Sequence, residues 1–350
     1  MLNQKKSFSL MLATLLLSAC ASDPEVTFSD RPSTQIPTIT KSVDHSQGNL
    51  PKSQTTQQTV VANAWMPSEP DNLPPANYHR YPEVQSFIQQ MVSKHGFSQT
   101  YLENLFAEAS RLESVIHSEM GDTKPSGPPK PHVGSWSRYR AVYLTEEHIQ
   151  DGVQFWRANA NVLQKASVTY GVDPEYIVGI IGVETYFGKN LGKVRVFDSL
   201  TTLAFDTPRR AKYFKTELEN FLLMTREESY APRSLVGSWA GAMGLGQFMP
   251  SSFRRLAIDF DHNGRRDLWQ PHDAIGSVAH YFSRSGWEYN SPVADQVNGP
   301  QGDSVIDLST YEGDEYWQTY HNFKVIKRYN NSKKYAMAVH QLAQAIKQRI

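Results

Sequence analysis

The sequence contains a single cysteine, Cys20, among its 350 residues. A disulfide needs two cysteines, so this thiol has no partner within the chain. The 11 histidines show neither an HExxH motif nor another paired-ligand spacing. The sequence therefore predicts neither a disulfide-stabilised fold nor a catalytic zinc site.

The chain also lacks an excess of charge of either sign, because 35 Lys and Arg residues balance 35 Asp and Glu residues. Domains that bind nucleic acids usually carry a net positive charge that attracts phosphates. The composition therefore gives no reason to expect a nucleic-acid partner. Hydrophobic residues make up 39% of the chain, enough for a substantial core in one or two domains.

No apolar run reaches the length of about 20 residues that a membrane-spanning helix needs. The N-terminus instead has Lys5 and Lys6 before an apolar segment at residues 8–17, the order found in export signals. Leu17-Ser18-Ala19-Cys20 resembles the bacterial lipobox, in which the cysteine is acylated and becomes the first residue of the mature protein. We interpret residues 1–19 as a lipoprotein signal peptide and Cys20 as the lipid attachment site, which also accounts for the lone thiol.

The alternative is an ordinary signal peptide cut after Ala21, because Ala19-Cys20-Ala21 also fits the small-x-small pattern of such sites. If Cys20 is lipidated, the residue that follows it is Ala21 rather than Asp. By the sorting rule for such lipoproteins, this residue predicts the outer membrane, with the protein facing the periplasm.

Residues 20–77 are rich in Ser, Thr, Gln, Pro and Asn and predict a flexible tether. Residues 78–350 predict a mainly α-helical domain, with strand signals confined to short pieces between about 289 and 328. A Pro/Gly-rich loop is expected at 121–131. Helices are expected near 84–96, 98–109, 145–171, 174–188, 199–206, 209–224, 251–258, 273–284 and 333–349.

One predicted helix carries a carboxylate in an apolar setting. Asp173 and Pro174 predict its start, and Ile177, Ile180, Ile181 and Glu184 fall on one face. Apolar surroundings and the negative end of the helix dipole both disfavour the ionised form of Glu184, so its pKa should be raised. A raised pKa suits a general acid at neutral pH. The helix alone also fits a surface Glu at a fraying helix end, or a Glu held by an Arg.

A glycine-rich segment at residues 237–250 precedes another predicted helix. Its four glycines permit tight turns and close approach of a ligand to the backbone, and Gln247 offers both a donor and an acceptor. No Lys-Ser/Thr follows the glycines, so the segment is not a phosphate-binding loop. It predicts a ligand-facing loop.

Val183-Glu184-Thr185 followed by Gly-Ala-Met-Gly-x-Gly-Gln-Phe-Met-Pro resembles the lytic murein transglycosylases, most closely their membrane-bound B type. The resemblance runs from about Tyr81 to the C-terminus and includes Arg209-Arg210-Ala211-Lys212-Tyr213-Phe214 and Val325-Ile326-Lys327-Arg328-Tyr329-Asn330. It implies a lysozyme-like, mainly α fold. It also implies cleavage of the β-1,4 bond between N-acetylmuramic acid and N-acetylglucosamine, leaving a 1,6-anhydromuramyl end.

The same resemblance implies roles for individual residues. Glu184 would be the acid/base of the reaction. Ser238 and Gln247 would contact the muramyl N-acetyl group and its neighbours. Further contacts with the glycan would come from Tyr139, Tyr213, Tyr281, Tyr329 and Asn330.

Residues 259–273 contain the opening of an EF-hand calcium loop. Asp259, Asp261 and Asn263 stand at positions 1, 3 and 5, and glycine at position 6. Position 12 is Gln270, so the standard signature lacks its closing Glu. The family resemblance implies a longer loop closed by Asp273 at position 15, with Arg265 contributing its backbone carbonyl. We predict a structural Ca²⁺ ion here; a polar turn is the alternative.

Two other functions stay open. A hydrolytic muramidase would use a second carboxylate, for which Asp198, Asp206 and Glu217 are candidates. A non-catalytic peptidoglycan-binding lipoprotein is the other alternative. The expected partners are peptidoglycan strands, the membrane through the lipid on Cys20, and other cell-wall enzymes. A basic cluster, which comprises Lys324, Lys327, Arg328, Lys333 and Lys334, is interpreted as a solvated face.

Overall fold

The computed structural model of the chain describes residues 74–121 and 133–350. The predicted signal peptide, Cys20, the tether up to residue 73 and most of the predicted loop at 121–131 lie outside the described residues. Within those two ranges, no helix is both long enough and apolar enough to cross a membrane.

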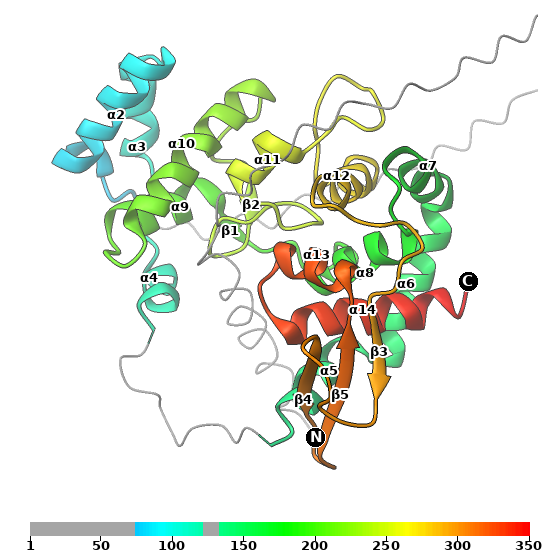
Figure 1. Ribbon diagram of the computed structural model, residues 1–350. Helices are drawn as coiled ribbons and strands as arrows, with labels where there is room; N and C mark the ends of the chain where they lie inside the picture. Colours follow the sequence, from blue (N-terminus) through cyan, green and yellow to red (C-terminus); the bar gives the residue numbers. More distant parts are fainter. Residues whose placement is uncertain (1–73, 122–132) are drawn as a thin grey trace, which may run out of the picture.

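The described residues form a mainly α-helical structure with two small antiparallel sheets (Figure 1). This confirms the predicted fold class. The elements are η2 (Tyr78–Arg80), α2 (Pro82–His95), α3 (Gln99–Ala107), α4 (Glu113–Met120), α5 (Ser135–Tyr143), α6 (Glu146–Ala158), α7 (Ala160–Tyr170), α8 (Pro174–Thr185), β1 (Val194–Arg195), α9 (Val196–Phe205), α10 (Ala211–Glu227), β2 (Val236–Gly237), α11 (Pro250–Leu256), α12 (Pro271–Arg284), β3 (Ala294–Val297), β4 (Val305–Ser309), β5 (Asp314–Thr319), α13 (His321–Tyr329) and α14 (Lys333–Lys347).

Helix α8 lies at the centre of the fold. Its residues from Glu175 to Thr185 are all buried, and it packs against α6, α7, α12 and α14 (Figure 1). Apolar surface on every side of a helix is typical of a core helix, since there is no face left for water. The sequence pattern suggested a single apolar stripe, but the helix is enclosed all round.

Asp173 occupies the predicted N-cap position of α8, but its carboxylate makes no capping hydrogen bond. Instead its Oδ2 accepts from Trp287 Nε1 at 2.8 Å and from the Asn290 backbone N–H at 3.2 Å. The prediction of the helix start is therefore correct, while the side chain fastens the start of α8 to the segment that follows α12.

The single helix expected at 145–171 is interrupted. Helix α6 ends at Asn159, whose backbone leaves the helical conformation with φ of −117° and ψ of 19°. Its side-chain amide donates to the Phe155 carbonyl at 2.8 Å. Helix α7 then begins at Ala160 and ends at Gly171, whose positive φ of 63° is the predicted C-cap conformation.

Strands β3, β5 and β4 form an antiparallel sheet in that order, with Gln296 opposite Trp317 and Ile306 also opposite Trp317. The strands lie between 294 and 319, so the predicted strand region ends sooner than expected. Its last residues form α13, where Phe323, Val325 and Ile326 face the core at helical spacing. Helices α4 and α5 were also missed by the sequence analysis.

Candidate active site

Glu184 lies in the last turn of α8, with only 5% of its surface exposed. The helix ends one residue later because Tyr186 and Phe187 adopt left-handed backbone conformations, with φ of 52° and 58°. The predicted helix, which extended to residue 188, was therefore too long. The turn folds the ring of Phe187 against Gly182, where a Cβ atom would lie 2.7 Å from that ring. A side chain at position 182 would have to displace that ring and the side chain of Leu342.

Burial raises the pKa of the Glu184 carboxyl to about 7, while a hydrogen bond from Tyr335 lowers it in part. This confirms the direction predicted from the apolar helix. The Tyr335 hydroxyl donates to Glu184 Oε1 at 2.5 Å. A carboxyl group that titrates near neutral pH can both donate and accept a proton under physiological conditions. Tyr335 was not among the predicted site residues.

Three further tyrosines lie within the electrostatic reach of Glu184. Burial is the main cause that raises the pKa of Tyr139, Tyr143 and Tyr329, and the charge of Glu184 adds to it in each case. Unlike Tyr335, these three tyrosines exclude water from Glu184 without lowering its pKa through a hydrogen bond, and the Tyr329 hydroxyl donates to the Gly246 carbonyl instead. Their packing therefore helps to keep the pKa of Glu184 high.

The glycine-rich segment forms a tight loop beside the end of α8. Its first residue, Gly237, pairs with Val194 of β1, and the Ser238 hydroxyl accepts a 3.0 Å hydrogen bond from the Ala242 backbone N–H. Gly244 has a φ of 71°, and a Cβ atom there would lie 2.5 Å from Leu268. Gln247 also has a left-handed backbone, and its Nε2 donates to the Gly244 carbonyl at 2.9 Å. The loop therefore has one closely specified shape.

Two side chains fasten this loop to the helices around it. The Thr185 hydroxyl, next to Glu184 in sequence, donates to the Leu245 carbonyl at 3.0 Å. The Tyr329 hydroxyl donates to the Gly246 carbonyl at 2.5 Å. The predicted catalytic helix, the glycine-rich loop and α13 thus meet at one place.

A cleft opens at this meeting point. Of the predicted site residues, Glu184, Tyr213, Ser238, Gln247, Tyr281, Tyr329 and Asn330 line it. Tyr139 does not; it is buried beside Trp136 and Tyr143. The lining also contains four further residues of the glycine-rich segment, Ala240, Ala242, Phe248 and Met249, and Arg328, which the sequence analysis assigned to a solvated basic cluster. Ser251, Ser252 and Arg255 of α11 complete it, and the sequence analysis did not single them out.

Glu184 is the one carboxylate among the described residues that line the cleft. The three carboxylates considered for a second role are engaged elsewhere. Asp198 is fully buried and paired with Arg195 at 2.8 Å. Asp206 accepts from Tyr78 and lies 3.3 Å from Arg111. The third, Glu217, accepts hydrogen bonds from the backbone N–H and hydroxyl of Ser251 at the start of α11.

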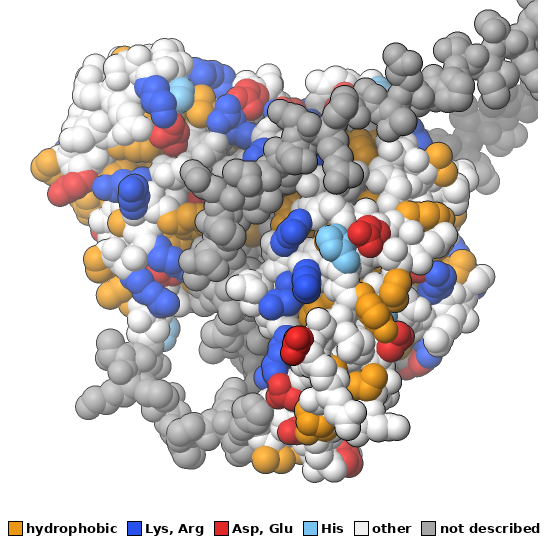
Figure 2. All heavy atoms as spheres, in the orientation of Figure 1, with side chains coloured by type: hydrophobic (Ala, Val, Ile, Leu, Met, Phe, Trp, Pro, Cys, Tyr) orange, Lys and Arg blue, Asp and Glu red, His pale blue; other side chains and the backbone are white. Residues whose placement is uncertain are grey.

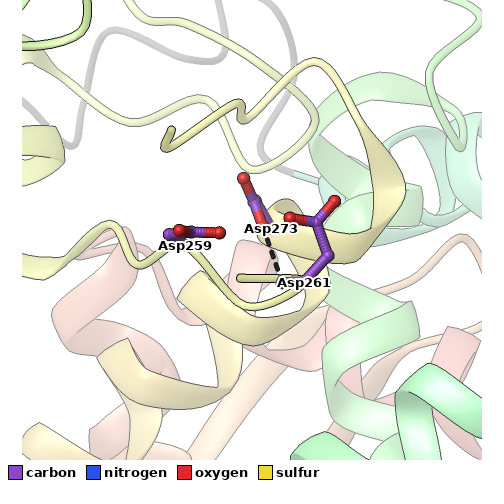
Figure 3. A group of neighbouring side chains, drawn as sticks. All are labelled: Asp259, Asp261 and Asp273. Carbon is purple, nitrogen blue, oxygen red and sulfur yellow. Dashed lines mark hydrogen bonds between the residues drawn. The ribbon is translucent and has the colours of Figure 1, made fainter. Parts of the chain in front are cut away.

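The acidic loop lies apart from the cleft lining, between α11 and α12. The carboxylates of Asp259, Asp261 and Asp273 converge, each offering an oxygen within 4.8 Å of the others (Figure 3). Asp273 is 1% exposed. Its buried carboxylate accepts hydrogen bonds from the backbone N–H groups of Phe260 and Asp267. Three acidic groups held together, one of them buried, are a suitable donor set for Ca²⁺.

The other two predicted calcium ligands belong to the same turn. The Asn263 side-chain oxygen accepts from the Arg265 backbone N–H at 3.0 Å, and the Arg265 guanidinium lies 3.9 Å above the ring of Tyr230. The loop continues to Leu268, whose carbonyl accepts from the Leu245 backbone N–H at 2.8 Å. The acidic loop is therefore connected to the glycine-rich loop of the cleft.

Comparison with known proteins agrees with this geometry. The model of the transglycosylase SLT domain family matches residues 79–311 and 301–344. The membrane-bound lytic murein transglycosylase B of Escherichia coli K12 is 44% identical over 298 residues, which cover 76% of this chain and 82% of that protein.

The solved structures that resemble the chain include the E. coli lytic transglycosylase Slt35, in complex with bulgecin A and in complex with calcium. Each is 41% identical, with a TM-score of 0.73, and the match covers 81% of this chain and 99% of Slt35. SltB3 of Pseudomonas aeruginosa in complex with NAG-anhNAM-pentapeptide is 28% identical, with a TM-score of 0.65, over 76% of this chain and 78% of that one. The chain belongs to the membrane-bound lytic murein transglycosylase B family and is a lytic murein transglycosylase.

Proposed function

We propose that the protein cleaves the β-1,4 bond between N-acetylmuramic acid and N-acetylglucosamine and leaves a 1,6-anhydromuramyl end, with Glu184 as the acid/base. The observation that carries this proposal is the buried carboxyl of Glu184, the one acid among the described residues that line the cleft, with a pKa of about 7. The complex of the relative SltB3 with NAG-anhNAM-pentapeptide supports an anhydro product.

In this reaction the protonated Glu184 gives its proton to the glycosidic oxygen as the bond from that oxygen to the muramyl C1 breaks. The carboxylate then takes the proton of the muramyl 6-hydroxyl, whose oxygen forms the new bond to C1. No water is consumed, and Glu184 ends in its starting protonation state. A pKa near neutrality suits a group that serves as acid and then as base.

A hydrolytic muramidase is the nearest alternative. Inverting glycosidases need a second carboxylate to activate water, and retaining enzymes need one as a nucleophile. None of Asp198, Asp206 and Glu217 is among the described residues that line the cleft. Each of these carboxylates already has a hydrogen-bonding or ionic partner elsewhere in the described part of the protein. These placements favour attack by the substrate's own hydroxyl.

The remaining cleft residues would bind the glycan. Within the described chain, the side-chain oxygen of Asn330 is buried without a hydrogen-bond partner, so it can accept from a sugar amide or hydroxyl. Gln247 and Ser238 belong to the glycine-rich loop and are held in place by hydrogen bonds within it. Tyr213, Tyr281 and Tyr329 offer aromatic faces to sugar rings. Tyr139 would act from behind the cleft wall, by packing near Glu184.

We also propose that Asp259, Asp261, Asn263, the Arg265 carbonyl and Asp273 hold a structural Ca²⁺ ion. The relative Slt35 has been solved in complex with calcium. Converging carboxylates repel one another, and a divalent cation removes that repulsion. The ion would stabilise the loop and has no part in the proton transfers.

For the cell, we propose a lipoprotein with residues 1–19 as the signal peptide, a tether from Cys20 to residue 77 and a catalytic domain at 78–350. The lipid on Cys20 would anchor it in the outer membrane, facing the periplasm. The relative's name, which describes it as membrane-bound, supports an association with membrane. Peptidoglycan strands are the proposed substrate, and other cell-wall enzymes are candidate partners.

Mass spectrometry of digested peptidoglycan tests the reaction. Anhydro-forming cleavage yields products lighter by one water than the reducing muropeptides, and Glu184→Gln should lower their formation by about 10²–10⁴-fold, toward the upper end. Reducing ends would establish hydrolysis instead. If the folded wild-type protein forms no product, the non-catalytic peptidoglycan-binding lipoprotein is the correct alternative. Full activity of a folded Glu184→Gln variant would show that Glu184 is not the acid/base.

A further inference from the structure

Two arginines are among the residues that line the cleft. Arg255 comes from α11, and Arg328 comes from α13, directly before Tyr329 and Asn330. Both side chains are exposed. They belong to segments 73 residues apart, so the fold alone brings them to one cleft.

Neither arginine is neutralised by the described part of the protein. No carboxylate there lies within ion-pair distance of Arg255 or Arg328, whereas the neighbouring Arg254 is paired with Glu227 at 2.8 Å. Arg328 uses one nitrogen to donate to the Ser285 carbonyl. Among the described residues, the only acid in the cleft lining is Glu184, which is buried and, with a pKa of about 7, partly protonated near pH 7. The solvent-facing part of this cleft is therefore positively charged.

Lysine and arginine side chains also gather on the surface over α13 (Figure 2). Lys324, on that helix, is exposed but does not line the cleft. A chain with no net charge thus concentrates positive charge beside its substrate site. This raises the local concentration of anionic ligands at the cleft.

The glycan that the proposed reaction cleaves supplies no such anion by itself, because its sugars are N-acetylated and its lactyl groups are joined to peptide through amide bonds. The negative charges of peptidoglycan are the carboxylates of its peptide stems. We infer that Arg255 and Arg328 bind stem-peptide carboxylates and so favour glycan strands whose peptide stems keep free carboxylates. This inference rests on the proposed function and adds a determinant of substrate choice to it.

Arginine suits this role because its planar guanidinium can bind a carboxylate through two parallel hydrogen bonds. The groups are exposed, so each contact contributes modestly and is weakened by salt. The stem peptide does not take part in bond breaking. We therefore expect the contact to lower KM for peptide-bearing strands, with little effect on kcat.

The test compares native peptide-bearing strands with the same strands after carbodiimide coupling to ammonia, which converts stem carboxylates to uncharged amides. For the wild-type protein, amidation should raise KM about threefold. Arg255→Gln should raise KM by a similar factor on native strands and leave it unchanged on amidated strands. The difference in KM between native and amidated strands for the wild-type protein should become smaller at high salt.

Arg255 is the cleaner position, because within the described residues its side chain has no partner to lose. Arg328→Gln should act in the same direction, and Arg255→Lys should retain most of the wild-type preference. Lys324→Gln is the matched control, since it removes one exposed charge from α13 outside the cleft lining. Its KM should equal that of the wild type on both substrates.

Two outcomes would overturn the inference. Equal losses on native and amidated strands would mean that Arg255 contacts the sugars or the fold, and unchanged KM on both would mean that it contacts nothing. Failure of the proposed function gives a different result, because the wild-type protein would then release no anhydro product from either kind of strand.

Discussion

The Tyr335 hydroxyl donates to Glu184 Oε1 at 2.5 Å, joining two buried side chains from α14 and α8 that are 151 residues apart. This hydrogen bond lowers the pKa of Glu184, against the larger effect of burial, which raises it. A donor to the carboxylate stabilises the ionised form. Tyr335 therefore sets how far above its ordinary range Glu184 titrates.

Replacing Tyr335 with Phe should raise the pKa of Glu184 further, because burial remains and the stabilising donor is lost. The proposed reaction begins with protonated Glu184, so the alkaline limb of the pH–kcat profile should move to higher pH. Tyr176→Phe is the matched control, since Tyr176 is a buried tyrosine hydrogen-bonded to His340 and Gln344. An alkaline limb that stays in place in Tyr335→Phe would show that this bond does not control the titration.

The raised pKa of Glu184 also has a consequence for stability. Between its ordinary pKa of 4.5 and the folded-state value of about 7, the folded protein retains a proton that the unfolded chain releases. The free energy of unfolding contributed by this group is therefore fully present below pH 4.5 and is lost as the pH rises through 7. The loss is about 3 kcal/mol.

Glu184→Gln removes this titration, so the free energy of unfolding of the variant should rise relative to the wild type by about 3 kcal/mol between pH 4.5 and 8. Denaturant unfolding of both proteins at matched pH values measures the difference, in which contributions from other groups cancel. A difference that does not change with pH would mean that Glu184 titrates in its ordinary range.

Chelation of calcium should lower the melting temperature, and added Ca²⁺ should restore it, because an ion that binds only the folded state stabilises that state. Asp259→Asn should abolish the response, since it removes one of the three converging carboxylates. Asp303→Ala, which changes an exposed acid outside this loop, is the control. If millimolar calcium does not change the melting temperature of the wild-type protein, the loop is a polar turn and not a calcium site.

Cys20→Ser should prevent lipidation and release the protein from the membrane or leave uncleaved precursor. Ala21→Asp keeps the cysteine and tests the sorting rule, so this variant should stay lipidated but move to the inner membrane. Membrane fractionation and metabolic labelling with a radioactive fatty acid distinguish the two changes. A Cys20→Ser protein that fractionates and migrates like the wild type would contradict the anchor.

Local sequence patterns were sufficient for several parts of the fold. Apolar periodicity and the Asp173-Pro174 start predicted α8, and clustered glycines predicted the loop that contains Gln247. Patterns of this kind report interactions within a few residues, such as helix initiation and turn formation. The same locality explains the errors at Asn159 and at residues 321–329. At Asn159, one side chain contributed to the end of a helix. At residues 321–329, packing against the core selected a helix in a region of weak strand signals.

The sequence by itself determined the family, the carboxylate at the end of an apolar helix and the acidic loop, because each is encoded in short motifs that can be recognised before the chain folds. Only the tertiary structure decided which groups surround Glu184. Tyr335 reaches it from α14, Asp198 and Glu217 are engaged elsewhere, and Arg255 and Arg328 meet at the cleft from separate helices. A pKa depends on burial and on neighbours in space, and these exist only once distant segments have packed together.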